Sequence, residues 1–101
     1  MTRTSWKDLQ SKKLSSMTIE ERKEYDQAYA EAQLAADVGE RIHAAREAAG
    51  LSQRELARRM GTSQAAIDRL ESGGVGATLT TLQRVATALG LEVNVELKPT
   101  A

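Results

Sequence analysis

Residues 51–73, which read LSQRELARRMGTSQAAIDRLESG, constrain the fold of this chain more than any other segment. Ser52 and Glu55 have the spacing of a capping box, in which each side chain bonds the other residue's backbone N–H. A helix is therefore expected to begin near Gln53. Gly61 can adopt a positive φ at low cost, so it ends this helix and turns the chain sharply. The segment thus opens with a short helix and a tight turn.

A second short helix follows the turn. Ser63 can cap its start, and Gly73 can end it. The apolar residues of both helices recur at helical spacing and give each helix one inward face. These inward residues are Leu56, Ala57, Met60, Ile67 and Leu70. Two short helices joined by a tight glycine turn are the unit that sets a helix into the major groove of DNA. The alternative is an ordinary αα-hairpin that binds no nucleic acid.

The segment resembles the helix-turn-helix of the Xre/Cro–phage-repressor family, in the pattern LSQ, ELA, G, S-Q, an apolar residue and E-x-G. Ala57 stands where the family needs a small residue for the two helices to cross closely. Gly61 stands at the turn, and Ile67 and Leu70 stand where the second helix packs on the first. The resemblance implies a small helical domain that binds DNA.

The outer face of the second helix offers side chains for reading bases, because Ile67 and Leu70 face inward. Gln can bond adenine, Arg can bond guanine, and an Ala methyl can contact the thymine methyl. Asp68 either orients Arg69 or accepts a hydrogen bond from a cytosine amino group. Both interpretations of Asp68 remain open from the sequence.

Arginines before and within the first motif helix are expected at phosphates, which position a protein on DNA without specifying sequence. Arg54 and Arg58 are the main candidates, and Arg46 is a further one. The family resemblance implies that Gln53 clamps Gln64 and touches a phosphate, while Gln64 reads a base. The predicted DNA-binding residues are Gln53, Arg54, Arg58, Ser63, Gln64, Ala65, Asp68 and Arg69.

The net charge of the chain is zero, with 14 basic and 14 acidic residues. This balance argues against indiscriminate binding to phosphates. The charges are unevenly spread: residues 41–69 carry six Arg against three acids, and residues 18–31 carry five acids against two bases. A protein with two different partners could be organised in this way.

Several function classes are disfavoured by what the composition lacks. The chain has no cysteine, which leaves no disulfide, thiolate nucleophile or zinc finger and fits a cytoplasmic location. His43 is the only histidine, so we expect neither an enzyme nor a metal or cofactor site. No apolar run is long enough to cross a membrane, and no second domain offers a pocket for a small-molecule effector.

Residues 37–90 are predicted to form one compact helical domain around the motif. A first helix ends at Gly50, and a last helix begins after Thr78 and ends at Gly90. The apolar stripes of these two flanking helices comprise Val38, Ile42, Ala45, Ala49, Leu79, Leu82, Val85, Ala86 and Leu89.

Residues 91–101 are expected to form a C-terminal strand and tail. Over residues 91–97, which read LEVNVEL, apolar residues alternate with polar ones. This alternation predicts one half-buried β-strand. A lone strand leaves its backbone groups unpaired, so we expect it to pair with its copy across the two-fold axis of a homodimer. The predicted dimerisation residues are Leu91, Val93, Val95 and Leu97. The alternative is that the strand docks on the sheet edge of another protein.

Residues 1–36 are predicted to form an arm that contains every aromatic residue of the chain. Thr18 and Glu21 form another capping box, which predicts a helix over about 19–36, and the residues before it are expected to be mobile. Trp and Tyr combine a large apolar area with a polar tip, which suits protein interfaces. The predicted partner-binding residues are Trp6, Leu9, Tyr25 and Tyr29. The alternative is that the aromatic residues fold back and complete the core of the helical domain.

An arm ahead of an Xre-type domain in a chain of 101 residues resembles the HigA antitoxins. The resemblance implies a cytoplasmic antitoxin that neutralises a small basic HigB-like toxin, an mRNA endonuclease of RelE-like fold, and represses its own operon. The alternative is a stand-alone Xre-family repressor of phage type without a toxin partner. The expected fold is mainly α: a phage-repressor-like bundle with an N-terminal helical arm and one C-terminal strand.

Overall fold

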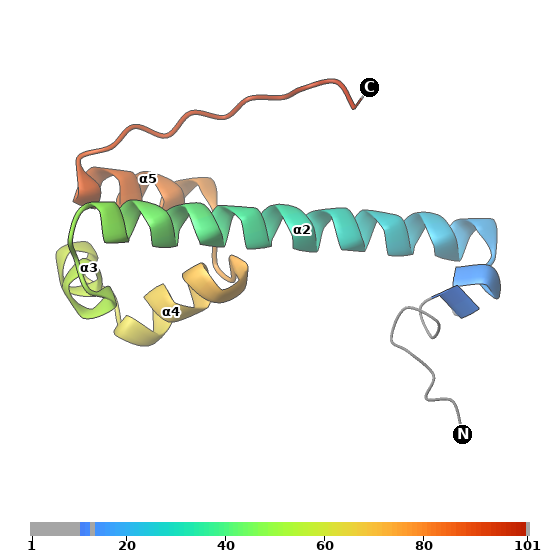
Figure 1. Ribbon diagram of the computed structural model, residues 1–101, viewed down its shortest axis with the longest axis horizontal. Coiled ribbons are helices and arrows are strands. Elements are labelled where there is room, and N and C mark those ends of the chain that lie inside the picture. Colours follow the sequence, from blue (N-terminus) through green and yellow to red (C-terminus); the bar gives the residue numbers. More distant parts are fainter. Residues whose placement is uncertain (1–10, 13, 101) are drawn as a thin grey trace. The chain divides into compact units, whose positions relative to one another are not determined.

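The computed structural model describes residues 11–12 and 14–100, and its main elements are helices (Figure 1). They are α2 (Ile19–Ala48), α3 (Gln53–Met60), α4 (Gln64–Gly73) and α5 (Leu79–Leu89). The chain divides into two units, residues 1–32 and residues 33–101. We describe each unit by itself, as the first unit and the second unit. In the part of the chain that is described, no helix is both long and apolar enough to cross a membrane.

One continuous helix, α2, stands where the sequence predicted two. The predicted start is confirmed, because the Thr18 hydroxyl accepts from the Glu21 N–H at 3.1 Å. The predicted end near Ala36 is wrong, since α2 continues to Ala48. Nothing in the sequence stops the helix there: Ala35 and Ala36 are strong helix formers.

In the first unit, α2 exposes most of its side chains. Tyr29 is 60% exposed, and Tyr25 is half-buried. Two pairs at i, i+4 spacing lie on this stretch, Arg22 with Asp26 at 3.6 Å and Gln27 with Glu31 at 3.3 Å. Such pairs stabilise an exposed helix slightly. The predicted partner residues Trp6 and Leu9 lie outside the described residues.

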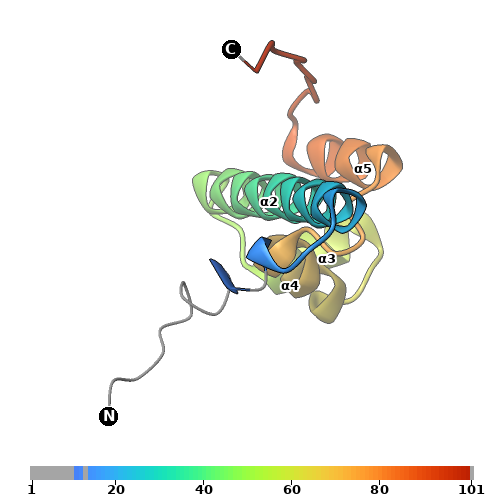
Figure 2. The same ribbon diagram turned by 90° about the vertical axis from the view of Figure 1, so that its right-hand side faces the viewer.

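The second unit has one apolar core, to which α2, α3, α4 and α5 all contribute. In both views α5 lies on one side of α2 and the α3–α4 pair on another (Figures 1 and 2). Leu56 and Ile67 are fully buried, one on each motif helix. The core cluster comprises Ile42, Leu56, Ala57, Met60, Ile67, Leu70 and Val85. The apolar periodicity of the sequence predicted these core residues correctly, but Ala49 and Leu79 of the predicted apolar stripes are exposed.

The helix starts in the second unit follow the predicted caps. The side chain of Ser52 accepts from Glu55 N–H, that of Ser63 from Ala66 N–H, and that of Thr78 from Thr81 N–H. Each bond satisfies one backbone donor that the first helical turn leaves free. The end of α4 differs by one residue from the expectation. Gly73 is its last helical residue, and Gly74 is the cap.

Two glycines let α2 cross the end of α4 with the backbones almost in contact. A Cβ atom at Gly39 would lie 2.6 Å from the carbonyl oxygen of Leu70 and 2.8 Å from that of Glu71. A Cβ atom at Gly74 would overlap the backbone of Ala35, and Gly74 also has a φ of 69°. Glycine is therefore required on both sides of this crossing.

The predicted β-strand over residues 91–97 is absent, and residues 91–100 form no regular secondary structure. Leu91 N–H bonds Ala86 carbonyl at 2.8 Å, and among the described residues no backbone hydrogen bond involves residues 92–100. Leu97 is 94% exposed. A strand needs a neighbour to accept and donate its backbone bonds, and the single chain offers none.

We predict that Gly39→Ala destabilises the second unit by about 1–3 kcal/mol, because backbone atoms of α2 and α4 would have to separate. Chemical denaturation followed by circular dichroism measures this loss. Gly73→Ala is the matched control: it is helical, and a Cβ atom there meets nothing within 4 Å. It should leave stability unchanged or raise it slightly. Equal stability of the two variants would contradict the close crossing.

Candidate nucleic-acid interface

The turn between α3 and α4 sets the second motif helix across the first. Gly61 has φ 66° and ψ 35°, and the Thr62 N–H bonds the Ala57 carbonyl at 2.9 Å. Ala57 is 3% exposed, so its small side chain lies where the two helices approach. Ile67 and Leu70 are buried beneath α4. The opposite face of α4 is therefore presented to solvent.

The residues predicted to contact DNA all come from α3, the cap of α4 and the first six residues of α4. All of them except the half-buried Gln53 are exposed. The Ser63 hydroxyl accepts from Ala66 N–H at 3.1 Å and still has a proton to donate. Free N–H groups at the start of α4 add to the attraction for a phosphate.

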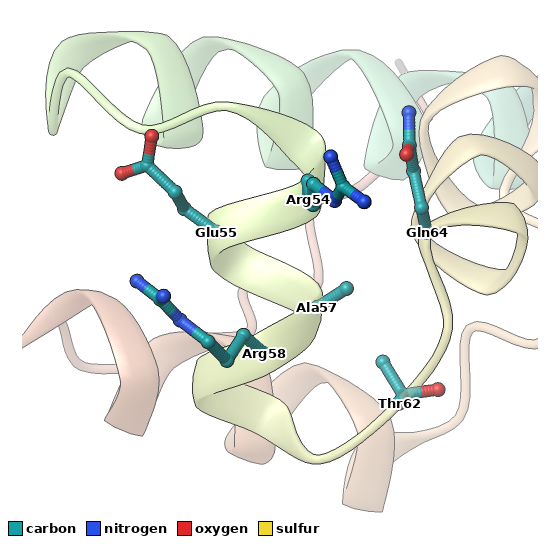
Figure 3. Close-up of a pocket in the computed structure, with 6 residues that line it drawn as sticks. All are labelled: Arg54, Glu55, Ala57, Arg58, Thr62 and Gln64. Carbon is teal, nitrogen blue, oxygen red and sulfur yellow. The ribbon is translucent and has the colours of Figure 1, made fainter.

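A hollow of about 440 Å³ lies between α3 and the start of α4. Figure 3 shows the Arg54 guanidinium directed towards Gln64, whereas Arg58 extends away from it. The lining residues are Arg54, Glu55, Ala57, Arg58, Thr62 and Gln64. The hollow thus joins a predicted phosphate contact to a predicted base contact. The hollow is open to solvent.

Asp68 has a partner within the protein. Its carboxylate accepts from the Gln53 side-chain amide at 3.4 Å, which links the start of α3 to the middle of α4. The family resemblance implied that Gln53 clamps Gln64; in this structure it holds Asp68 instead. An acid at position 68 attracts the amide donor more strongly than a neutral side chain does.

Arg46 is buried, which contradicts its expected role at a phosphate. The residue is 8% exposed. Its Nε and Nη2 atoms donate to the two carboxylate oxygens of Glu71 at 2.8 and 2.9 Å, and its Nη1 donates to the Leu51 carbonyl at 2.7 Å. These bonds tie together α2, the α2–α3 connection and the end of α4. Sequence analysis missed this cluster, although Arg46 follows Ile42 by four residues and Glu71 stands in the E-x-G pattern.

His43 completes the cluster at its outer edge. Its Nδ1 lies 2.5 Å from a Glu71 oxygen, and its Nε2 lies 3.0 Å from Glu47. Burial alone would raise the pKa of Glu71, but hydrogen bonds from Arg46 and His43 outweigh burial and lower that pKa below its ordinary value of 4.5. The hydrogen bond to Glu71 likewise raises the pKa of Arg46. Glu71 therefore stays ionised in the folded protein at neutral pH.

Two other arginines have structural partners and are distinct from the predicted DNA contacts. Arg59 donates to the Ala88 carbonyl at 3.3 Å, and Arg84 donates to the Met60 carbonyl. Both bonds join α3 and α5 and satisfy carbonyl groups near helix ends. Arg54, Arg58 and Arg69 are exposed, as is Arg59 despite its bond to α5.

A protein-family model described as helix-turn-helix matches residues 42–95, which is more than half of the chain. The match includes all of α3, α4 and α5 and the last turns of α2. It does not extend to residues 1–41. A comparison with curated proteins found no match.

We predict that Glu71→Gln destabilises the protein at neutral pH by about 3–5 kcal/mol, because it removes the hydrogen-bonded counter-charge of the buried Arg46 and leaves the exposed Glu47 as its charge neighbour. Glu47→Gln is the matched control, since Glu47 also contacts His43 but its side chain is 61% exposed. Chemical denaturation of both variants measures the difference. Equal stability would contradict the importance of the buried pair.

The lowered pKa of Glu71 also predicts a pH dependence of stability. A carboxyl whose pKa is lower when folded stabilises the fold above its unfolded pKa, near 4.5, and loses this contribution as the pH falls through the folded value. The unfolding free energy of the wild type should therefore fall more steeply below pH 4.5 than that of Glu71→Gln. Parallel curves for the two proteins would rule out this contribution.

Proposed function

Because the chain belongs to the helix-turn-helix family of DNA-binding domains, we propose that it is a transcription regulator that reads an operator with α4. The exposed face of α4 carries this proposal. Gln64, Ala65 and Arg69 are solvent-exposed, while Ile67 and Leu70 fix the opposite face in the core. Family members of this kind are typically regulators rather than enzymes.

The proposed contacts divide into two classes. Arg54, Arg58 and the Ser63 cap bind phosphates and set the protein on the duplex. Gln64 and Arg69 bond base edges in the major groove. The Gln53–Asp68 hydrogen bond links α3 to α4 beside these contacts.

A chain with zero net charge gains little from bulk attraction to DNA, so specific binding requires more than one reading helix. We propose a homodimer formed through the C-terminal segment. Its two α4 helices would meet successive major grooves about 34 Å apart, so the operator would be a pseudo-palindrome. A dimer on such a site represses transcription by occupying it.

We predict that Arg69→Ala weakens binding to the cognate operator by about 1–3 kcal/mol and relaxes one base position, with little effect on random DNA. The operator is first selected from a random duplex library, and affinities are measured at fixed salt. Arg58→Ala should weaken binding to both DNAs alike. Arg22→Ala, an exposed arginine of the first unit, should change neither. Equal losses on both DNAs for Arg69→Ala would make it a phosphate contact.

A second function is favoured by the helix of the first unit. Five acids lie between residues 18 and 31, and Tyr29 on the same stretch is 60% exposed. Large exposed aromatic side chains beside acids suit a basic protein partner. We therefore propose that the protein is a cytoplasmic antitoxin of HigA type, whose arm binds and silences a small basic HigB-like toxin. The rival proposal is a stand-alone repressor.

Co-expression with the product of the neighbouring reading frame tests the antitoxin proposal. The neighbour alone should arrest growth, and the wild-type chain should relieve the arrest. Tyr25→Ala/Tyr29→Ala should weaken this relief, whereas Arg69→Ala should retain it while losing operator binding. A neighbour that is harmless on its own would favour the stand-alone repressor. Full relief by the double variant would remove the two tyrosines from the interface.

A further inference from the structure

An open groove of about 520 Å³ lies in the second unit between α2, α5 and the residues after α5. We call residues 91–98 the terminal segment. Figures 1 and 2 show it leaving the end of α5 as an extended chain. Leu34, Val38 and Leu82 are among the apolar residues that line the groove from the two helices. Leu34 is 66% exposed and Val95 is 64% exposed, so apolar surface is left uncovered there.

The groove and the terminal segment each leave groups without a partner in the single chain. The groove lacks an apolar cover, and the segment lacks a neighbour for its backbone. A second copy of the segment satisfies both, because it brings the same apolar alternation and a free backbone edge. We propose that the segments of two copies pair as antiparallel strands and cover the grooves of both copies. The two-fold axis passes between the two Val95 residues, so that Val95 of one copy faces Val95 of the other; we call this an axis at Val95. This inference rests on the proposed dimer and specifies its interface.

Charge selects the register of the pair. Apolar residues must stay on one face, so odd-numbered residues face odd-numbered ones. An axis at Asn94 places Glu92 opposite Glu96 of the other copy, which is repulsive. An axis at Val95 places Glu92 opposite Lys98 and Asn94 opposite Glu96, which is attractive. Lys98 already lies 3.9 Å from Glu96 of its own chain, on the polar face.

The cap of α5 disfavours a third register, with the axis at Val93. There Gly90 is the residue opposite Glu96, so the ladder either includes Gly90 or is limited to residues 91–95. Gly90 has a φ of 69°, far from strand geometry, and its N–H bonds the carbonyl of Thr87 at 3.3 Å. Pairing there would break the end of α5.

The positions of the free backbone N–H groups also support the axis at Val95. That register places Leu91 opposite Pro99. Pro99 has no N–H, and the N–H of Leu91 is already bonded to Ala86 at 2.8 Å. If the odd-numbered pairs are the non-hydrogen-bonded ones, neither missing donor is needed. The even-numbered residues between them then supply the ladder bonds.

Engineered cysteines test this register directly, because the chain has no cysteine of its own. At a non-hydrogen-bonded pair the Cα atoms are about 4.5 Å apart. Val95→Cys should therefore form a disulfide-linked dimer under mild oxidation. Asn94→Cys is the matched control: its two Cα atoms would lie diagonally, about 7–8 Å apart, beyond disulfide reach. Cross-linking of Asn94→Cys without Val95→Cys would overturn the proposed axis.

A charge reversal gives a second readout. Glu92→Lys should place Lys opposite Lys98 and raise the dissociation constant of the dimer by about 2- to 30-fold, because two symmetry-related pairs change. Glu92→Lys/Lys98→Glu should restore it. An axis at Asn94 predicts the opposite, since the new Lys would meet Glu96. Tighter association of Glu92→Lys would therefore overturn the proposal.

Measurements of the oligomeric state test the proposed dimer and the proposed interface separately. Light scattering should show a dimer for the full chain and a monomer after deletion of residues 91–101. A monomeric full chain would refute the proposed dimer. A dimer that survives the deletion would refute the terminal interface and leave the dimer proposal standing.

Discussion

The second unit depends on the buried ion pair between Arg46 and Glu71. Apolar packing is non-directional, so the directed bonds of this pair add to the close glycine crossing in setting how α4 lies against α2. The two parallel bonds of the guanidinium to the carboxylate fix both distance and orientation. The third bond, to Leu51, adds the connection to α3. The Gln53–Asp68 bond adds a contact between α3 and the middle of α4, and the outer face of α4 stays free.

Structural features that depend on neighbouring residues could be predicted from the sequence. Contacts between residues far apart in the sequence could not. Ser52, Ser63 and Thr78 cap the helices that they were expected to cap, because a cap involves only residues three positions apart. The Arg46–Glu71 pair joins residues 25 positions apart, and no local pattern identifies such a partner. An arginine on an otherwise apolar stripe was therefore interpreted as a phosphate contact.

The terminal segment shows a second reason why sequence patterns alone do not determine secondary structure. Alternation in LEVNVEL states which side chains prefer one face, but strand formation also needs a neighbouring backbone. The expected strand is accordingly absent from the single chain. The predicted end of α2 near Ala36 is absent because a helix needs no neighbouring segment. Its hydrogen bonds lie within the helix and continue until a residue stops them.

The cap of α5 has a consequence for DNA recognition by the proposed dimer. Leu91 is tied to Ala86 by a hydrogen bond, so the segment leaves the bundle in a direction set by the last helical turn. The residues that would pair therefore begin directly after α5. The direction of the segment would then set the distance between the two α4 helices. Operators with one base pair inserted at their centre would bind more weakly.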